Sequence, residues 1–253
     1  MKVLTVDIGN TYVKCAVYID DMIVKSWKML SVKEGTVEDY FQKMKTHLPK
    51  DKVDFASVSS VVPPISKTFE QIFNMHLKIP FHFVNALTEL GLKFLVKDPS
   101  FIGADLVVNA FAAKEKYKTN CIIIDLGTAT TIQLVGADGM FYGTAIFPGV
   151  QTSANSIISK AAQLKNFEFN VPEKVLGTNT VESLSTGIIR SHAYAIDLFI
   201  DNIKKEYDHL HDIKVIMTGG GAQMVTGYTQ NVDVVDEDLL LQGLSRVKAW
   251  DGD

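Results

Sequence analysis

Apolar runs, polar turns and helical periodicities follow each other along this chain in an order that occurs twice. Each half opens with three short apolar runs separated by tight polar turns, which predicts a three-stranded meander. The predicted strands are 2–6, 13–18 and 22–29 in the first half, and 121–125, 130–135 and 140–147 in the second. The repeat indicates two similar halves.

After each meander, apolar residues recur every three or four positions, which predicts helices with one buried face. Thr36 and Asp39 have the spacing of a helix N-cap pair. We expect helices at 37–48, 65–73, 103–118, 151–164, 181–206 and 238–248, and further strands at 55–59, 81–84, 214–218 and 232–235. Because no linker rich in Pro, Gly or Ser separates the halves, we place the domain boundary inside or just after the helix that begins at 103–105, giving domains 1–115 and 116–253.

A short motif is shared by the two meanders. Asp7-Ile8-Gly9 after the first strand returns as Asp125-Leu126-Gly127, and small polar residues follow both. Glycine at a strand end lets the backbone turn tightly and approach a ligand closely. One such turn is an ordinary hairpin, but two at equivalent places favour two halves facing each other across a phosphate-binding cleft. A phosphoryl-transfer enzyme is the first hypothesis.

The first turn has the chemistry for a nucleotide triphosphate. Backbone amides and the side chains of Asn10 and Thr11 can donate to phosphate oxygens. Asp7 would need a cation beside a triphosphate, and Mg²⁺ is the expected one. Lys14 adds a positive charge.

The second turn offers another carboxylate, Asp125, which residue chemistry alone suggests as a second cation ligand. Thr128 lies in the turn itself, and its hydroxyl is our choice for a phosphate contact. Thr130 and Thr131 have the alternative explanation of strand propensity.

Two further features are candidates with equally good structural explanations. Asp105 lies at a predicted helix start, where it either receives the proton of an acceptor hydroxyl or only satisfies first-turn amides. The Gly219-Gly220-Gly221 turn either lies against a nucleotide or simply connects a strand to a helix.

Composition narrows the range of partners. Hydrophobic residues make up 47% of the 253 residues and the net charge is −4, which is typical of a globular protein and argues against nucleic acid. No apolar stretch approaches the ~20 residues that span a bilayer, and no leader pattern opens the chain. Cys15 and Cys121 lie in apolar runs and are expected to be buried free thiols, and the six histidines have no metal-ligand spacing. We expect a cytoplasmic protein that binds neither nucleic acid nor membrane.

The ordered set of motifs resembles the type III pantothenate kinases, which are related to Baf-family proteins and belong to the acetate and sugar kinase/Hsp70/actin superfamily. The motifs that carry the resemblance are 7–11, 59–63, Pro99 with 103–105, 125–130, 148–149, 177–180, 186–187, 218–220 and 241–244. The resemblance implies an α/β fold of two similar ribonuclease H-like (actin-like ATPase) domains, each a mixed five-stranded sheet with flanking helices.

The same resemblance implies a function and a set of site residues. It implies ATP-dependent phosphorylation of pantothenate to 4'-phosphopantothenate, the first step of coenzyme A biosynthesis, with Mg²⁺ and a monovalent cation (K⁺ or NH₄⁺), in a homodimer. Asp105 would be the general base and Asp125 would hold the monovalent cation, which replaces the second Mg²⁺ ligand suggested above. The implied ATP contacts, with Asp7 also on Mg²⁺, are Asp7, Ile8, Gly9, Asn10, Thr11, Tyr12, Val13, Lys14 and Thr128. The implied pantothenate contacts are Gly103, Ala104, Asp105, Leu106 and Thr180.

Four positions depart from the family's pattern. Leu106 stands where Arg is usual and Val96 where Tyr is usual, and both are on the acceptor side. Gly221 replaces a frequent Asp, and Ser191 a frequent Gly. Leucine cannot supply the charge and five donors of Arg. Two alternatives therefore stay open: a regulatory Baf-like homologue that binds nucleotide, and a kinase for another small hydroxyl compound.

Overall fold

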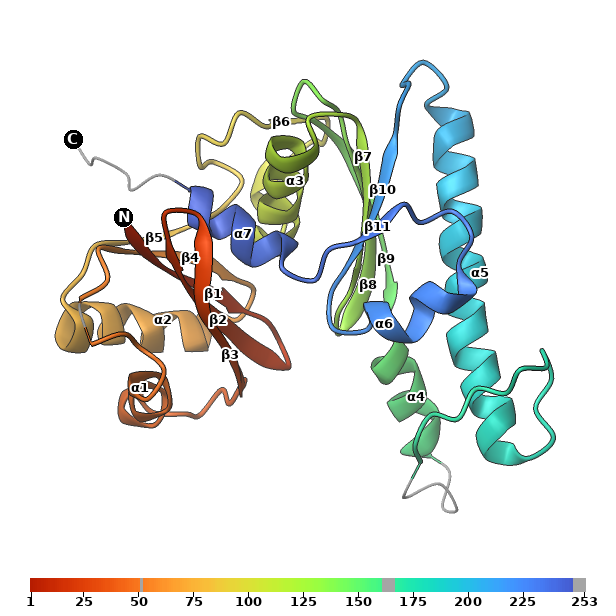
Figure 1. Cartoon of the computed structure of the whole chain (residues 1–253), viewed down its shortest axis with the longest axis horizontal. Coiled ribbons are helices and arrows are strands. Elements are labelled where there is room, and N and C mark those ends of the chain that lie inside the picture. The colour runs from red at the N-terminus through yellow and green to blue at the C-terminus, as the bar shows by residue number, and fades with distance from the viewer. Residues whose placement is uncertain (51, 161–166, 248–253) are drawn as a thin grey trace. The chain divides into compact units, whose positions relative to one another are not determined.

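The structure is a computed structural model, and it describes residues 1–50, 52–160 and 167–247. By their contacts, the described residues divide into two compact units (Figure 1). The first consists of 1–92, 96–112 and the residues from 238 onward, and the second of 93–95 and 113–237.

The first unit is built on a five-stranded mixed sheet in the order β3-β2-β1-β4-β5. The first three strands form an antiparallel meander, and β4 and β5 add in parallel. The strands are β1 (Lys2–Ile8), β2 (Tyr12–Ile19), β3 (Met22–Leu30), β4 (Phe55–Ser60) and β5 (Phe81–Phe83). Its helical segments are α1 (Val37–Lys45), α2 (Pro63–Gln71), the π-helical turn Ile72–Leu77 and the 3₁₀ turn Pro99–Phe101.

The core of the first unit forms where β1, β2 and β4 meet α1 and α2. Alternate residues of β1, such as Leu4 and Val6, pack with Tyr40 of α1 and Phe69 of α2. Thr36 caps α1 in a reciprocal arrangement with Asp39, as the sequence predicts. The remaining residues of β1, among them Asp7, therefore belong to the opposite face of the sheet.

The second unit repeats this topology. Its sheet has the order β11-β10-β7-β8-β9-β6, in which β7, β8 and β9 form the antiparallel meander and β10 and β11 add in parallel. The strands are β7 (Cys121–Leu126), β8 (Ala129–Val135), β9 (Met140–Pro148), β10 (Lys214–Thr218), β11 (Val234–Val235) and β6 (Lys93–Phe94). Two similar mixed sheets are thus confirmed, but the prediction of five strands in each misses β6, a two-residue strand that pairs with β9.

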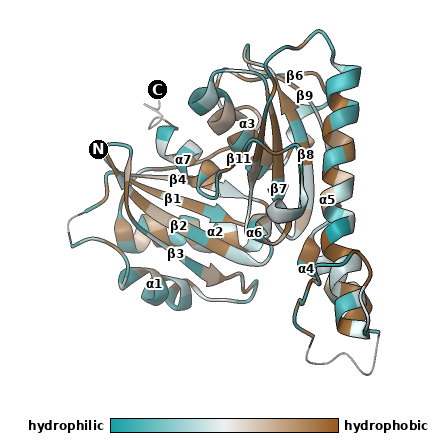
Figure 2. Ribbon diagram, turned by 45° about the vertical axis from the view of Figure 1, so that its right-hand side comes forward, coloured by the Kyte–Doolittle hydropathy of each residue, from teal (hydrophilic) through white to brown (hydrophobic). Residues whose placement is uncertain are grey.

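The helices of the second unit are α4 (Val150–Ile158), α5 (Thr180–Glu206) and the short α6 (Ala222–Val225), followed by the 3₁₀ turn Thr226–Tyr228. α5 alternates hydrophobic and hydrophilic residues along its length, and its buried side includes Ile189, Ile196 and Ile200 (Figure 2). The predicted continuation of α4 into 161–164 lies outside the described residues.

Two helices connect the halves of the sequence. α3 (Ala104–Tyr117) starts in the first unit and ends in the second, so the division falls inside it. α7 (Leu239–Arg246) packs on β1, β2 and β4 and is grouped with the first unit, although it follows the second in sequence. The domain boundary expected between residues 115 and 116 stays a prediction. No helix within the described ranges is long and apolar enough to cross a membrane.

Candidate functional site

The turn between β1 and β2 presents the first Asp-x-Gly motif. Asp7 is the penultimate residue of β1, and the N–H of Gly9 donates to the carbonyl oxygen of Tyr12 at 3.0 Å. Ser31 holds the turn from outside, because its hydroxyl donates to the Gly9 carbonyl at 2.6 Å and its N–H to the Thr11 carbonyl at 3.0 Å. The turn is therefore a fixed loop with exposed polar groups.

Sheet register decides which residues of this motif can contact a ligand. Asp7 is paired with Lys14 on β2 and Ser59 on β4, so the three side chains share one face of the sheet. Ile8 and Val13 are buried in the core, which leaves only their backbone groups for phosphate. Among the remaining residues expected to contact ATP, Asn10, Thr11 and Tyr12 are exposed.

Asp105 lies in the first turn of α3. Its Oδ1 accepts the N–H of Leu106 at 2.9 Å, and the side chain is partly exposed. This hydrogen bond is the one expected if Asp105 satisfies the amides of the first helical turn. It also orients the carboxylate. Leu106 is only 7% exposed, so the residue that replaces the family's Arg is buried.

The second Asp-x-Gly motif occupies the equivalent place in the second unit. Asp125 is the penultimate residue of β7, paired with Thr131 on β8 and Thr218 on β10. Gly219 has a φ of +89°, and a Cβ there would lie 2.3 Å from Oδ1 of Asp125. A Cβ there would also lie 2.7 Å from the backbone nitrogen of Leu126, so the positive φ and this backbone contact require glycine at 219. This favours the interpretation of the triplet as a strand-to-helix turn that packs on the Asp125 motif.

Thr128 is exposed at the tip of the second turn, whereas Thr130 is buried in β8. The Thr128 carbonyl accepts the N–H of Gly149 at 3.0 Å and the hydroxyl of Thr152 at 2.6 Å. A Cβ on Gly149 would lie 2.2 Å from the carbonyl oxygen of Gly127, so only glycine allows α4 to start this close. The choice of Thr128 agrees with its position in the turn.

Thr180 opens α5 and is exposed. The preceding residues form a helix cap: Asn179 accepts the N–H of Glu182 at 3.0 Å, and Glu182 accepts the N–H and the hydroxyl of Thr178, both at 2.8 Å. These hydrogen bonds from Thr178 lower the pKa of Glu182 below its ordinary value. The motif at 177–180 therefore acts locally as a cap that fixes the place of Thr180.

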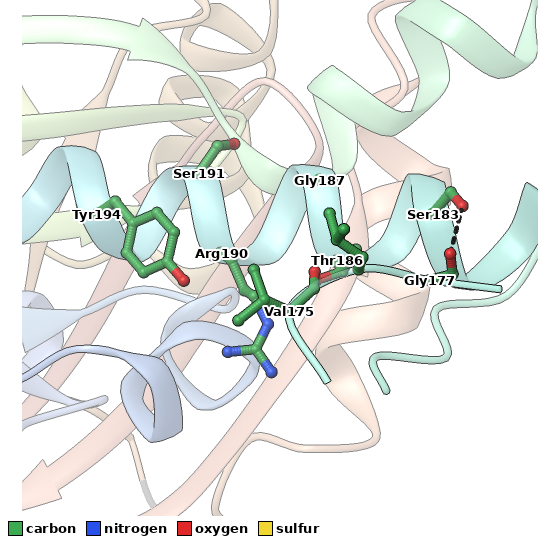
Figure 3. Close-up of a pocket in the computed structure, with 9 residues that line it drawn as sticks. Val175, Gly177, Ser183, Thr186, Gly187, Arg190, Ser191 and Tyr194 are labelled. Atoms are coloured by element: carbon green, nitrogen blue, oxygen red, sulfur yellow. Dashed lines mark hydrogen bonds between the residues drawn. The ribbon is translucent and has the colours of Figure 1, made fainter. Parts of the chain in front are cut away.

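A pocket of about 430 Å³ opens along α5, and Gly177 of the motif at 177–180 is among its lining residues (Figure 3). Its wall on the helix contains small residues four apart, Ser183, Gly187 and Ser191, together with Arg190 and Tyr194. None of the residues expected to bind ATP or pantothenate lines it. The four-residue spacing of small residues was visible in the sequence, but only the structure shows that they share a hollow.

The described residues contain no cluster of three or more His, Cys, Asp or Glu side chains that could hold a metal ion. Cys15 and Cys121 are buried free thiols, as predicted, and burial raises the pKa of Cys121 to about 12. A Mg²⁺ ion commonly uses one or two carboxylates with phosphate and water oxygens, so the donor chemistry of Asp7 fits such an ion.

Comparison with known proteins identifies the family. The model of the type III pantothenate kinase family matches residues 3–202. The chain belongs to this family. A type III pantothenate kinase from Desulforapulum autotrophicum is 34% identical over 248 residues, which cover 95% of this chain and 94% of that protein.

Solved structures show the fold of this type III pantothenate kinase family member to be that of actin-like ATPases. A Baf family transcriptional activator from Campylobacter jejuni aligns with a TM-score of 0.58 at 18% identity, over 96% of both chains. The activator of 2-hydroxyisocaproyl-CoA dehydratase from Clostridium difficile, solved with bound ADPNP, aligns with a TM-score of 0.53 at 15% identity, over 98% of this chain and 93% of that one. At these identities the likeness concerns the fold alone.

Proposed function

We infer that this chain phosphorylates pantothenate with ATP, the reaction to which its family membership points. The observation that carries the inference is the family match over residues 3–202, in a chain whose two Asp-x-Gly motifs occupy the same register position in two sheets of the same topology. The product is 4'-phosphopantothenate, the first intermediate on the way to coenzyme A.

The proposed roles follow the chemistry of each turn. Residues 7–14 receive the phosphates, and Lys14, beside Asp7 in the sheet, supplies positive charge. Mg²⁺ held by Asp7 would neutralise charge on the phosphates. Thr128 contacts ATP from the tip of the second turn, and residues 103–106 with Thr180 contact pantothenate.

Asp105 is proposed as the general base. The pantothenate hydroxyl oxygen forms a bond to the γ-phosphorus, the bond from that phosphorus to the bridging oxygen breaks, and ADP leaves with the electron pair. The hydroxyl proton passes to the Asp105 carboxylate. The exposure of this carboxylate at a helix start supports the role, because the acceptor must reach it.

The test is a coupled assay of ADP release with pantothenate and with a panel of other small hydroxyl compounds. Asp105→Asn keeps the side-chain shape and removes the base, so turnover should fall by about 100-fold or more. Asp208→Asn, at an exposed position after α5, is the matched control and should behave as wild type. A rate for Asp105→Asn within about threefold of wild type means that another group takes the proton.

Asp125 is proposed as the ligand of K⁺ or NH₄⁺. Its carboxylate lies between Thr131 and Thr218 in the sheet, which places hydroxyl oxygens on the same face. We expect Asp125→Asn to remove most of the stimulation by K⁺ while Mg²⁺ dependence stays. Equal K⁺ stimulation in the variant and the wild type would exclude this role.

A homodimer is proposed as the working form. Tyr194 and Leu198 lie four residues apart on α5 and are 53% and 62% exposed, and adjoining exposed apolar side chains fit a surface covered by a second copy. Light scattering should give twice the mass of the chain, and Leu198→Lys should shift the mass toward the monomer. The acidic net charge of −4 supports the absence of nucleic acid among its partners.

A further inference from the structure

One peptide unit lies between the Thr128 turn and helix α5. Its carbonyl oxygen, on Pro148, is 3.0 Å from Nε2 of His192. Its N–H, on Gly149, donates to the Thr128 carbonyl at 3.0 Å. In a trans peptide the C=O and N–H bonds point in opposite directions within one plane, so a bond that fixes the oxygen also fixes the direction of the N–H. His192 and Thr128 therefore hold opposite ends of the same plane.

The surroundings of His192 fix its ring. The residue is 6% exposed, and its ring lies 5.7 Å from that of Phe147. Nδ1 is 2.8 Å from the carbonyl oxygen of Ile188, one turn earlier in α5. Both ring nitrogens thus face carbonyl oxygens. Because a carbonyl oxygen can only accept, the contact with Pro148 is favourable only when Nε2 carries the hydrogen.

The two hydrogen-bond contacts of the His192 ring differ in how much they can affect the Thr128 turn. The same rule holds for Nδ1 and the Ile188 carbonyl, so a neutral ring can donate to only one of the two carbonyl oxygens. The Ile188 carbonyl lies inside α5 and also accepts the Ser191 hydroxyl at 3.0 Å, so it has a donor without His192. The Pro148 carbonyl lies where β9 ends and α4 begins, and the next residue, Gly149, lies so close to the Gly127–Thr128 turn that a Cβ on it would be 2.2 Å from the Gly127 carbonyl oxygen. Loss of the Nε2 contact should therefore affect the turn, while loss of the Nδ1 contact should not.

We propose that His192 is a positioning residue for nucleotide binding. Its Nε2–H orients the Pro148–Gly149 peptide, and that peptide holds the backbone of Thr128 in the conformation that receives ATP. Thr152 holds the same carbonyl from α4 through its hydroxyl. The inference rests on the proposed contact between Thr128 and ATP.

Two substitutions of His192 test the roles of its two ring nitrogens separately. In His192→Gln the amide nitrogen can take the place of Nε2, and in His192→Asn it can take only the place of Nδ1. Calorimetric titration with a non-hydrolysable ATP analogue should show binding within about twofold of wild type for Gln and about three- to tenfold weaker for Asn, the size of one lost hydrogen bond. The KM for ATP should change in parallel, and the KM for pantothenate should not. Equal affinities for the two variants would overturn the proposal.

Thr128→Ala shows whether a failed test concerns the role of His192 or the proposed contact between Thr128 and ATP. If that variant binds the analogue as wild type does, the assignment of Thr128 is wrong, and the proposal fails with it. If Thr128→Ala weakens binding and His192→Asn does not, only the role of His192 is wrong.

A measurement on the wild-type chain avoids any loss of folding in the variants. With ¹⁵N-labelled histidine, the ring resonances of His192 are assigned by their disappearance in His192→Gln. We expect Nε2 to carry hydrogen and its resonance to move when the ATP analogue is added. A deprotonated Nε2 would rule out the proposed hydrogen bond.

Discussion

Replacing Gly219 by alanine should disturb the Asp125 turn, whereas the same change one residue later should be harmless. At Gly219 the backbone has φ +89°, and a Cβ would lie 2.3 Å from Oδ1 of Asp125 and 2.7 Å from the backbone nitrogen of Leu126. At Gly220 a Cβ would meet nothing within 4 Å. Comparing Gly219→Ala with Gly220→Ala therefore tests the local packing at Gly219, because both variants add the same methyl group to the same loop.

The expected loss in the free energy of unfolding of Gly219→Ala has two contributions. A residue with a Cβ in the left-handed region costs about 1–2 kcal/mol. The contact with the Leu126 backbone cannot be relieved by a side-chain rotation, and overpacking of this kind costs about 1–3 kcal/mol. We therefore expect Gly219→Ala to lower the free energy of unfolding by about 2–5 kcal/mol. Gly220→Ala should stay within about 1 kcal/mol of wild type.

Urea unfolding gives the first readout, and the dependence of ADP release on K⁺ concentration gives the second. Because the added methyl group meets the Asp125 carboxylate, the K⁺ concentration for half-maximal rate should rise in Gly219→Ala and not in Gly220→Ala. The reasoning is refuted if the two variants differ by less than about 0.5 kcal/mol and respond to K⁺ alike.

Three further changes test other parts of the structure. Lys116→Met removes the Nζ donor 2.6 Å from Oδ2 of Asp236, which is 8% exposed, so the free energy of unfolding should fall by about 1–3 kcal/mol; unchanged urea unfolding would contradict this. Leu106→Ala should cost about 2–4 kcal/mol because the side chain is buried, and a cost near zero would show that Leu106 does not pack in the core. The lowered pKa of Glu182 means that its stabilising effect is present above its ordinary value of 4.5 and is lost as the pH falls through the folded value. Melting temperatures of wild type and Glu182→Gln should therefore differ at pH 7 and converge as the pH is lowered below 4.5, and a constant difference would contradict the assignment.

The local elements could be predicted because their signals are local. Strands β7 and β10 and the capped helix α1 follow from apolar runs and from the Thr36–Asp39 pair, whose interactions lie within a few residues. The repeated Asp-x-Gly motif also indicated two similar halves, and the two meanders followed by parallel strands confirm that repeat.

Other features depend on residues far apart in the sequence. The two-residue strand β6 has too little pattern of its own and exists because β9 offers it an edge. An amphipathic helix such as α7 shows which of its faces is buried but not which sheet covers it, so its packing on β1 was not predictable. His192 likewise has no motif, since its partner, Pro148, is 44 residues away.

The sequence by itself determined the repeated sheets, the two Asp-x-Gly turns and the family, because these follow from local periodicity and from short ordered motifs. Only the tertiary structure decided that Gly219 packs against Asp125 and the Leu126 backbone, that Leu106 is buried, and that a peptide at the start of α4 is held between His192 and Thr128. These relations depend on distances between side chains and backbone atoms that are remote along the chain, and such distances are fixed only when the sheets and helices pack.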